Sequence, residues 1–381
     1  MTRSIYFSEE HELLRTQIRR FIAKEVIPFG DQWEQDGRTP RDVLRKMGDL
    51  GFLGIQYSEE YGGAEMDVLA STLYAEELGR STYGGFAITA LVHTDMASPH
   101  LANAGSKAQL DKYMPDIIAG RKIAAVAVTE PDAGSDVAGL KTRAVKDRDH
   151  WILKGTKMFI TNGVHGDIYF VAVKTDMEAK GSRGITIFIV EKGTPGFTVG
   201  RSLDKMGWRS SDTAELVFDN VRIHEENILG EVNKGFYAIM KNFQNERTVL
   251  GAQALGEAQK ALELTLDYVK ERKAFGGTLW DKQAIRQRLS QRQSEVAAGQ
   301  QLLYHCAWLN ANGEECVKEV SMVKAYCGEL VNRVMYDCQQ FHGGFGYMRE
   351  STIERMVRDA RIQSIGGGAT EVMLEEIAKR L

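Results

Sequence analysis

One acidic residue of this chain, Glu246, lies where a helix should be apolar. The stripe positions of that helix recur at intervals of three and four residues, at Phe236, Ile239, Phe243, Glu246 and Leu250. A carboxyl group on such a stripe loses its hydration, which disfavours the charged form and raises the pKa. A carboxylate with a raised pKa can take a proton from carbon near neutral pH. The alternative is an ordinary helical glutamate that pairs with Arg247 or another cation.

Two further segments could hold a flat ring. Residues 128–136 read VTEPDAGSD and predict a tight turn rich in backbone N–H and hydroxyl donors, which could cradle a heterocycle or a phosphate. Residues 157–163 read KMFITNG and place Phe159 and Thr161 on one face of a strand, where they could stack on a ring and hydrogen-bond it. Taken alone, the first segment is also typical of a plain turn, and the second of core packing and a strand end.

Composition excludes several classes of protein. With 381 residues, 43% hydrophobic and 26% charged, the chain can bury a large core and is not disordered. A net charge of −4 gives no electrostatic reason to expect a nucleic-acid partner. We expect neither a membrane span nor a targeting segment, and therefore a cytoplasmic protein. The four cysteines have no metal-ligand spacing, so we expect reduced, mostly buried thiols and no metal site.

The order of elements is helices, strands, helices. Helical patterns occupy residues 8–28, 40–50, 67–79, 86–104 and 107–118, and later 235–271, 281–312, 316–342, 350–360 and a stretch from Thr370. Short β-rich runs occupy 122–129, 150–153, 167–173, 184–190 and 215–218. This spacing predicts an α+β protein with an antiparallel barrel or sandwich in the middle, and not a doubly wound parallel sheet.

Four ordered motifs together resemble the acyl-CoA dehydrogenase family, over nearly the whole chain. They are the two ring-binding segments, residues 271–276 (ERKAFG) followed by residues 283–285 (QAI), and residues 340–347 (QFHGGFGY). The resemblance implies an N-terminal helical domain over 1–119, a β-barrel domain over 120–229 and a C-terminal four-helix-bundle domain over 230–381. It also implies non-covalently bound FAD and, usually, a homotetramer.

The resemblance carries cofactor-binding roles to matching positions. The residues expected around the flavin ring are Val128, Thr129, Gly134, Ser135, Phe159 and Thr161. Phe159 stands where many relatives carry tryptophan, and Ser135 would also touch the substrate. The residues expected at the pyrophosphate and adenosine of a neighbouring subunit's FAD are Arg272, Phe275, Gln283, Gln340, Gly343 and Gly344. Arg272 could instead be a C-terminal helix cation, and the glycine pair a helix cap and turn.

This chain departs from most of the family at the catalytic base. The usual position, in the loop before the last helix, is occupied by Gly367. The isovaleryl-CoA and long-chain types place the glutamate on the helix that precedes the arginine motif, and Glu246 matches that site. The resemblance therefore identifies Glu246 as the base, and the backbone N–H of Gly367 as a donor to the thioester oxygen. Ala369 stands where threonine is common, and Thr370 and Glu371 are the candidates to replace its bond to the cofactor.

The expected reaction is the FAD-dependent conversion of an acyl-CoA thioester to the trans-2-enoyl-CoA, with electrons passing to electron-transferring flavoprotein. The absence of a side chain at Gly367 favours a branched or a medium- to long-chain acyl group. Candidate substrate contacts are Ser135, Tyr237, Phe243, Arg247 and Gly368, although the two aromatics could equally be bundle core. The alternatives are a flavin monooxygenase or oxidase of the same fold, and a non-catalytic assembly protein.

Overall fold

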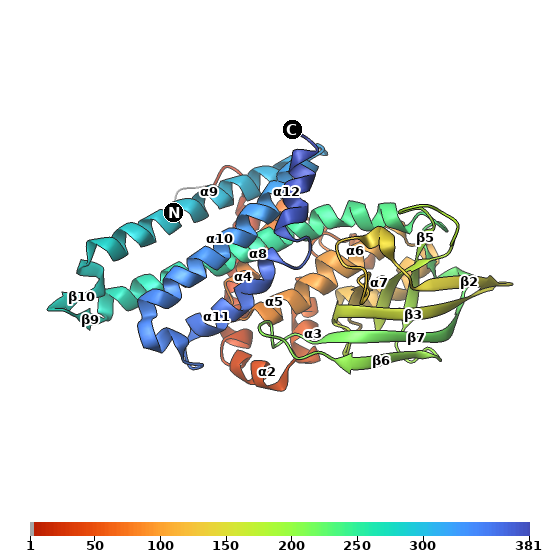
Figure 1. Ribbon diagram of the computed structural model, residues 1–381, viewed down its shortest axis with the longest axis horizontal. Helices are drawn as coiled ribbons and strands as arrows, with labels where there is room; N and C mark the ends of the chain where they lie inside the picture. The colour runs from red at the N-terminus through yellow and green to blue at the C-terminus, as the bar shows by residue number, and fades with distance from the viewer. Residues whose placement is uncertain (1–3) are drawn as a thin grey trace.

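The computed structural model describes residues 4–381 as helices, then a sheet, then helices (Figure 1). Residues 1–3, the start of the expected N-terminal domain, lie outside the described residues. The α+β class and the helical, β and helical order are therefore confirmed. The expected divisions after residues 119 and 229 stay predictions. Helix α7 ends at Ile118, and α8 begins at Gly235.

The N-terminal part is helical. Its helices are α1 (Glu9–Phe21), α2 (Gly30–Asp36), α3 (Arg41–Asp49), α4 (Val68–Gly79), α5 (Gly84–Leu91), α6 (Ser98–Ala104) and α7 (Lys107–Ile118). Ser8 caps α1 as its position predicts, because its hydroxyl accepts from the backbone N–H of His11. A π-helical turn, η3 (Val92–Ala97), continues α5 into α6. The sequence patterns did not predict α2, a short helix that buries Trp33.

The middle part is an eight-stranded sheet. Its strands are β1 (Ala124–Ala127), β2 (Arg143–Asp147), β3 (His150–Thr161), β4 (Ile168–Lys174), β5 (Ile185–Glu191), β6 (Phe197–Ser202), β7 (Thr213–His224) and β8 (Ile228–Leu229). The strand order is β6-β7-β3-β2-β4-β5-β8, and β1 pairs with β4. Most pairs are antiparallel, as expected, but β1 and β2 each run parallel to β4. Strands β2 and β6 were not predicted because most of their side chains are exposed and few are apolar.

The C-terminal part is a helical bundle. Its elements are α8 (Gly235–Glu271), the hairpin β9 (Lys273–Ala274) and β10 (Gly277–Thr278), α9 (Gln283–Ala311), α10 (Val317–His342), α11 (Thr352–Ala360) and α12 (Thr370–Ala378). Helix α8 has 37 residues and runs from the sheet to the far tip of the bundle (Figure 1). It packs against α4, α9 and α10. It is therefore the element that joins the sheet to the bundle.

The interior contains separate apolar clusters, one of them at the seam, which is the boundary where the sheet meets the helices. One cluster fills the helical parts, and another lies between the sheet and helices α6, α7 and α8. The approach at the seam is close, because a Cβ placed on Gly235 would lie 3.0 Å from the Ile187 backbone nitrogen. All four cysteines are buried and free, as expected. Within residues 4–381, no helix is long and apolar enough to cross a membrane.

Candidate active site

Glu246 lies on α8 with only 7% of the residue exposed. Burial raises the pKa of its carboxyl group to about 8, while a hydrogen bond from Asn242 and the charge of Arg247 lower it by less. The Asn242 amide donates to Glu246 Oε1 at 3.0 Å. The Arg247 guanidinium lies over the Phe243 ring, 5.6 Å from the ring centroid. Glu246 is thus the buried acid that its stripe position predicts, and not the surface glutamate of the alternative.

Two asparagines of α8 hold this part of the helix against the π-helical turn η3. Asn242 donates to Met96 O at 2.9 Å, and Asn245 donates to Asp95 O at 2.9 Å. Single π-helical turns recur at functional sites. Asn242 therefore binds the turn and the Glu246 carboxyl group with one amide, which restricts where that acid can point. The sequence reading missed this contact.

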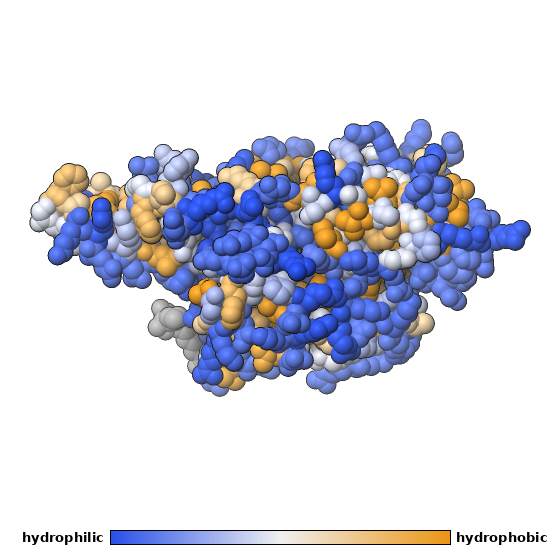
Figure 2. Space-filling model, turned by 90° about the horizontal axis from the view of Figure 1, so that it is seen from below, coloured by the Kyte–Doolittle hydropathy of each residue, from blue (hydrophilic) through white to orange (hydrophobic). Residues whose placement is uncertain are grey.

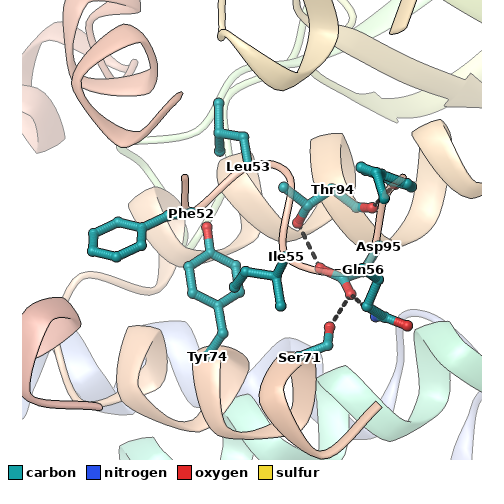
Figure 3. Close-up of a pocket in the computed structure, with 9 residues that line it drawn as sticks. Phe52, Leu53, Ile55, Gln56, Ser71, Tyr74, Thr94 and Asp95 are labelled. Atoms are coloured by element: carbon teal, nitrogen blue, oxygen red, sulfur yellow. Dashed lines mark hydrogen bonds between the residues drawn. The ribbon is translucent and has the colours of Figure 1, made fainter. Parts of the chain in front are cut away.

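A second buried acid, Asp95, belongs to the same turn. Its carboxyl group accepts hydrogen bonds from the hydroxyls of Ser71 and Thr94 (Figure 3). Burial raises its pKa, and those hydrogen bonds lower it by less. The acid lines a cavity of about 10 Å³, enough for one water molecule. The buried hydroxyl of Tyr74 lines the same cavity and has no hydrogen-bond partner among residues 4–381.

The glycine loop, residues 366–368 before α12, touches α8 one turn beyond Glu246. Gly367 has a φ of +63°, and a Cβ placed on it would lie 2.2 Å from Leu250 Cδ1. A side chain at position 367 would displace Leu250, which gives a steric reason for glycine there. Gly368 has a φ of +104°, and its Cβ would lie 3.5 Å from Arg247 Nε. That nitrogen is buried without a hydrogen-bond partner in the described part of the chain.

A lysine that the sequence reading missed holds this loop. Lys324, on α10, donates from Nζ to Gln363 O at 2.6 Å and to Gly368 O at 3.1 Å. It is 2% exposed, and burial lowers the pKa of its amine to about 8. Its position in the middle of a helical pattern gave no signal, because its partners are backbone carbonyls of a distant loop.

On the sheet side, a buried ion pair fixes the loop after β1. Lys157 Nζ lies 2.8 Å from Glu130 Oε1 and donates to Val128 O at 2.8 Å. The backbone N–H of Met158 donates to Thr129 O at 2.9 Å. These contacts join the 128–136 loop to β3, so the two predicted ring-binding segments are side by side. The sequence reading did not single out Glu130 or Lys157.

The predicted ring-binding residues offer an open face that fits a flat heterocycle. β3 is irregular between Lys157 and Ile160, and Phe159 adopts a φ of +61° that leaves it 66% exposed. Thr161 pairs with Thr213 of β7 and is half-buried. An exposed aromatic face next to backbone and hydroxyl donors can stack on a ring and hydrogen-bond its edge. Gly134 and Ser135 are exposed at the tip of the loop, and Val128 is buried at its base.

The residues predicted for pyrophosphate and adenosine lie elsewhere. They are exposed at the end of the bundle remote from the sheet: Arg272, Phe275, Gln283, Gln340, Gly343 and Gly344. Along α8, Glu246 and Arg272 are separated by roughly 39 Å at 1.5 Å per residue. That distance exceeds the length of an extended FAD molecule. A single chain therefore keeps the residues predicted for pyrophosphate and adenosine apart from the residues predicted for the flavin ring. Gly343 also forms the C-cap of α10 with a φ of +59°, as the simpler alternative has it.

The remaining predicted residues surround the start of α8 and the start of α12. Tyr237 is 59% exposed and lines a cleft of about 470 Å³ with Lys180, Arg183 and Lys234. Phe243 is half-buried and packs on the apolar cluster of the seam. Thus Tyr237 is not bundle core, and Phe243 packs against the cluster between the sheet and the helices.

At the start of α12, the Thr370 hydroxyl donates to Glu329 Oε1 at 2.9 Å. Glu371 is exposed on the first turn of the same helix. In this arrangement the Thr370 hydroxyl already has a protein partner, and the Glu371 side chain is turned to the surface. Of the two residues predicted to replace a lost cofactor bond, Thr370 is therefore engaged within the protein and Glu371 faces the solvent.

Comparison with known proteins gives consistent matches along the chain. Models of the acyl-CoA dehydrogenase N-terminal, middle and C-terminal domains match residues 8–121, 125–221 and 233–381. The mouse mitochondrial long-chain specific acyl-CoA dehydrogenase is 40% identical over 98% of this chain and 87% of its own. The caffeyl-CoA reductase-Etf complex subunit CarC of Acetobacterium woodii is 37% identical over 97% of each chain. The crystal structure of an acyl-CoA dehydrogenase from Geobacillus kaustophilus superposes with a TM-score of 0.95 at 40% identity, covering 99% of both chains.

Proposed function

Because this chain belongs to the acyl-CoA dehydrogenase family, we propose that it oxidises an acyl-CoA thioester to the trans-2-enoyl-CoA with Glu246 as the base. Enzymes of this family depend on FAD. The observation that supports the proposal best is the pairing of a buried acid on α8 with a glycine loop that touches the same helix one turn later. A side chain at Gly367 would need a left-handed backbone and would have to push aside the end of the Leu250 side chain, so this position favours glycine.

In this proposal, FAD supplies the acceptor for the hydride that leaves the β carbon of the substrate. Its ring would lie on the face formed by Phe159, Thr161 and the 128–136 loop, which the Lys157–Glu130 ion pair holds in place. The exposure of Phe159 supports this placement, since a large apolar side chain that is 66% exposed gains stability when a ring covers it.

Glu246 receives the proton of the α carbon on its carboxylate. Its raised pKa matches this role, because a base is most effective when its pKa lies close to the working pH. Asn242 positions the acceptor oxygen from one side. The negative charge that develops on the thioester oxygen needs a fixed donor, and the backbone N–H of Gly367 would supply one without any side chain. Gly368 and Arg247 would border the same space.

The CoA part of the substrate would pass Ser135 and reach the cleft beside Tyr237. Three cations line that cleft, Lys180, Arg183 and Lys234, against two acids, Asp176 and Glu178. The cations are the groups that could meet a phosphorylated carrier, and Tyr237 adds an exposed aromatic face. We propose a branched or a medium- to long-chain acyl group, since residues 366–368 of the glycine loop carry no side chains of their own. Phe243 would form part of the wall.

The proposal includes its partners. The electron acceptor would be electron-transferring flavoprotein, and the Acetobacterium woodii relative is by name a subunit of a complex with Etf. A homotetramer would place Arg272 and the other residues predicted for pyrophosphate and adenosine on the FAD of a neighbouring chain. That arrangement would account for the distance, within one chain, between these residues and those predicted for the flavin ring. The three domains would divide near residues 119 and 229, and the protein would be cytoplasmic.

The central test replaces Glu246 with glutamine. Glu246→Gln keeps the size and the Asn242 contact but removes the base, so we expect FAD to stay bound while anaerobic bleaching by acyl-CoA falls to background. Glu76→Gln is the matched control, because Glu76 is a buried acid with a raised pKa on α4 and contacts Gln300 and Tyr304 instead. It should bleach like the wild type.

Undiminished bleaching by Glu246→Gln would refute the assignment. A panel of straight and branched acyl-CoAs on the wild type identifies the substrate class. Slow reoxidation of the bleached wild type in air separates a dehydrogenase from a monooxygenase or oxidase. A purified protein without flavin colour would instead favour an assembly role.

A further inference from the structure

The loop that carries Gly367 is tied at both ends to one buried amine. Lys324 Nζ donates to Gln363 O at 2.6 Å on one side of the loop and to Gly368 O at 3.1 Å on the other. Hydrogen bonds from an ammonium group are roughly twice as strong as those between neutral groups. The intervening turn includes Gly367 in a left-handed conformation. The position of the Gly367 N–H therefore depends on the two carbonyls that Lys324 holds.

The burial of Lys324 is also unusual for a charged residue. Lysine is almost never fully buried unless it is paired, yet Lys324 is 2% exposed and both of its hydrogen-bond partners are neutral carbonyls. The charge of the nearby Arg247 lowers the pKa of Lys324 further. Two cations therefore lie beside the glycine loop, and the Nε of Arg247 has no partner in residues 4–381. Two buried positive charges close to each other are unfavourable unless a negative charge arises near them.

We propose that Lys324 is a positioning residue of the reaction: it fixes the Gly367 N–H toward the thioester oxygen and keeps a positive charge behind it. This rests on the proposed function. When Glu246 takes the α proton, the electron pair of the broken C–H bond moves toward the carbonyl, and negative charge collects on its oxygen. A donor fixed in advance, with a cation behind it, stabilises that charge without reorganisation. Lys324 itself neither gains nor loses a proton in the step.

Several other ionisable groups act on Lys324, on its neighbour Arg247 or on the loop that Lys324 holds. Those on α8, α10 and α12 that bear on its charge or on its loop are Glu246, Arg247, Glu257, Cys327, Glu329 and Glu376. Burial raises the pKa of Glu257 to about 8, and this acid contacts the Gln363 side chain. Burial raises the pKa of Cys327 to about 12. Between pH 6 and 9, Glu246 and Glu257 are the acids on these helices that would overlap with Lys324. Asp359 on α11, whose pKa is raised to about 7 and whose charge acts on Glu257, titrates in the same range.

The direct test measures the carbonyl of a bound product. An enoyl-CoA labelled with ¹³C at the thioester carbonyl is bound to the FAD-loaded protein, and its carbonyl stretch is read by difference infrared spectroscopy. We expect the wild type to shift the stretch to lower frequency and Lys324→Met to lose most of that shift, with less effect on enoyl-CoA affinity. Lys324→Arg should retain part of it, since arginine keeps the charge. A wild-type shift in Lys324→Met would overturn the proposal.

A matched control separates this role from a general effect on folding. Lys205 is a half-buried lysine whose pKa is also lowered to about 8, and it donates to Ser211 O and to Thr213 Oγ1 in the sheet part. Lys205→Met should leave the carbonyl shift unchanged even where its thermal unfolding temperature falls as much as that of Lys324→Met. Equal loss of the shift in both variants would reduce Lys324 to a structural residue.

A pH titration needs no change at Lys324 and covers the case in which Lys324→Met fails to fold. In a Glu246→Gln, Glu257→Gln background Asp359 is the overlapping acid that stays, with a pKa of about 7. The carbonyl shift should fall as the pH rises through about 8, where Lys324 loses its proton. Adding Lys324→Arg should abolish that step. A shift that stays constant from pH 6 to 9 in the background protein contradicts the proposal. Failure of the wild type to bleach with any acyl-CoA contradicts the proposed function instead.

Discussion

At the scale of single residues, the chemistry depends on which charges the fold strips of water. Glu246 is one helical position away from Arg247, yet the desolvation of its buried carboxyl group outweighs the attraction between them. The Arg247 guanidinium lies over the Phe243 ring. A carboxyl group with a pKa of about 8 is mostly protonated at neutral pH and gains its reactive form as the pH rises. This sets the sign of the expected pH dependence.

The bleaching rate should therefore rise with pH. At saturating acyl-CoA, we expect the rate constant for anaerobic flavin bleaching to increase by about tenfold per pH unit on the acid side, since the carboxylate fraction grows at that rate below the pKa. The rise should level off near pH 8, and stopped-flow absorbance between pH 6 and 8 measures it. A rate that does not change over this range would mean that Glu246 is already ionised or is not the base. Glu246→Gln supplies the background rate.

At the scale of elements, helix α8 and the glycine loop form the site together. The helix positions the acid, and Lys324 and Leu250 define the path of the loop beside it. The loop and the helix also meet at position 367, where a side chain would need the space that the end of the Leu250 side chain, one turn after Glu246, occupies in this chain.

Gly367 and its neighbour Gly366 should respond differently to alanine. Gly367→Ala should lower the free energy of unfolding by roughly 2–5 kcal/mol, from the left-handed backbone and from overpacking against Leu250. Gly366→Ala is the control, because its φ is not left-handed and a Cβ there meets its nearest atom at 3.5 Å. It should be neutral or stabilise by up to about 1 kcal/mol. Urea unfolding measures both, and equal effects would contradict the steric account.

At the scale of the whole molecule, α8 separates two groups of predicted cofactor residues by the length of the bundle (Figure 1). The remote tip exposes large apolar side chains, Phe275 at 90% and Tyr347 at 81%. Apolar colour is visible at that end of the molecule in Figure 2, seen from below. An exposed apolar tip that also carries Arg272 is suited to cover another chain and a phosphate at the same time.

Arg272→Ala should therefore weaken the hold on FAD without touching the chemistry of Glu246. We expect a lower flavin-to-protein ratio after gel filtration, while added FAD restores bleaching. Lys273→Ala is the control, since Lys273 is the adjacent exposed cation on β9 but lacks the planar fork that matches phosphate oxygens. If both variants retain FAD like the wild type, Arg272 is an ordinary cation at the end of a helix.

Much of the architecture followed from local pattern. The bounds of α8 were predicted to the residue, and α9, α10 and α11 to within two residues, because each has a long apolar period. The buried position of Glu246 followed from the same period. Strands β2 and β6 were missed because an exposed strand has no such pattern, and α2 because it is short.

The sequence by itself determined most of the helices and strands, the family, and the position of Glu246 on an apolar stripe, since these depend on repeats and motifs within short stretches of chain. Only the tertiary structure decided that Lys324 holds the glycine loop, that Asn242 joins the acid to a π-helical turn, and that the Leu250 side chain lies against Gly367. Each of these contacts joins residues more than 30 positions apart. Their physical basis is the close approach of backbone carbonyls and side chains from different elements, and no local period encodes it.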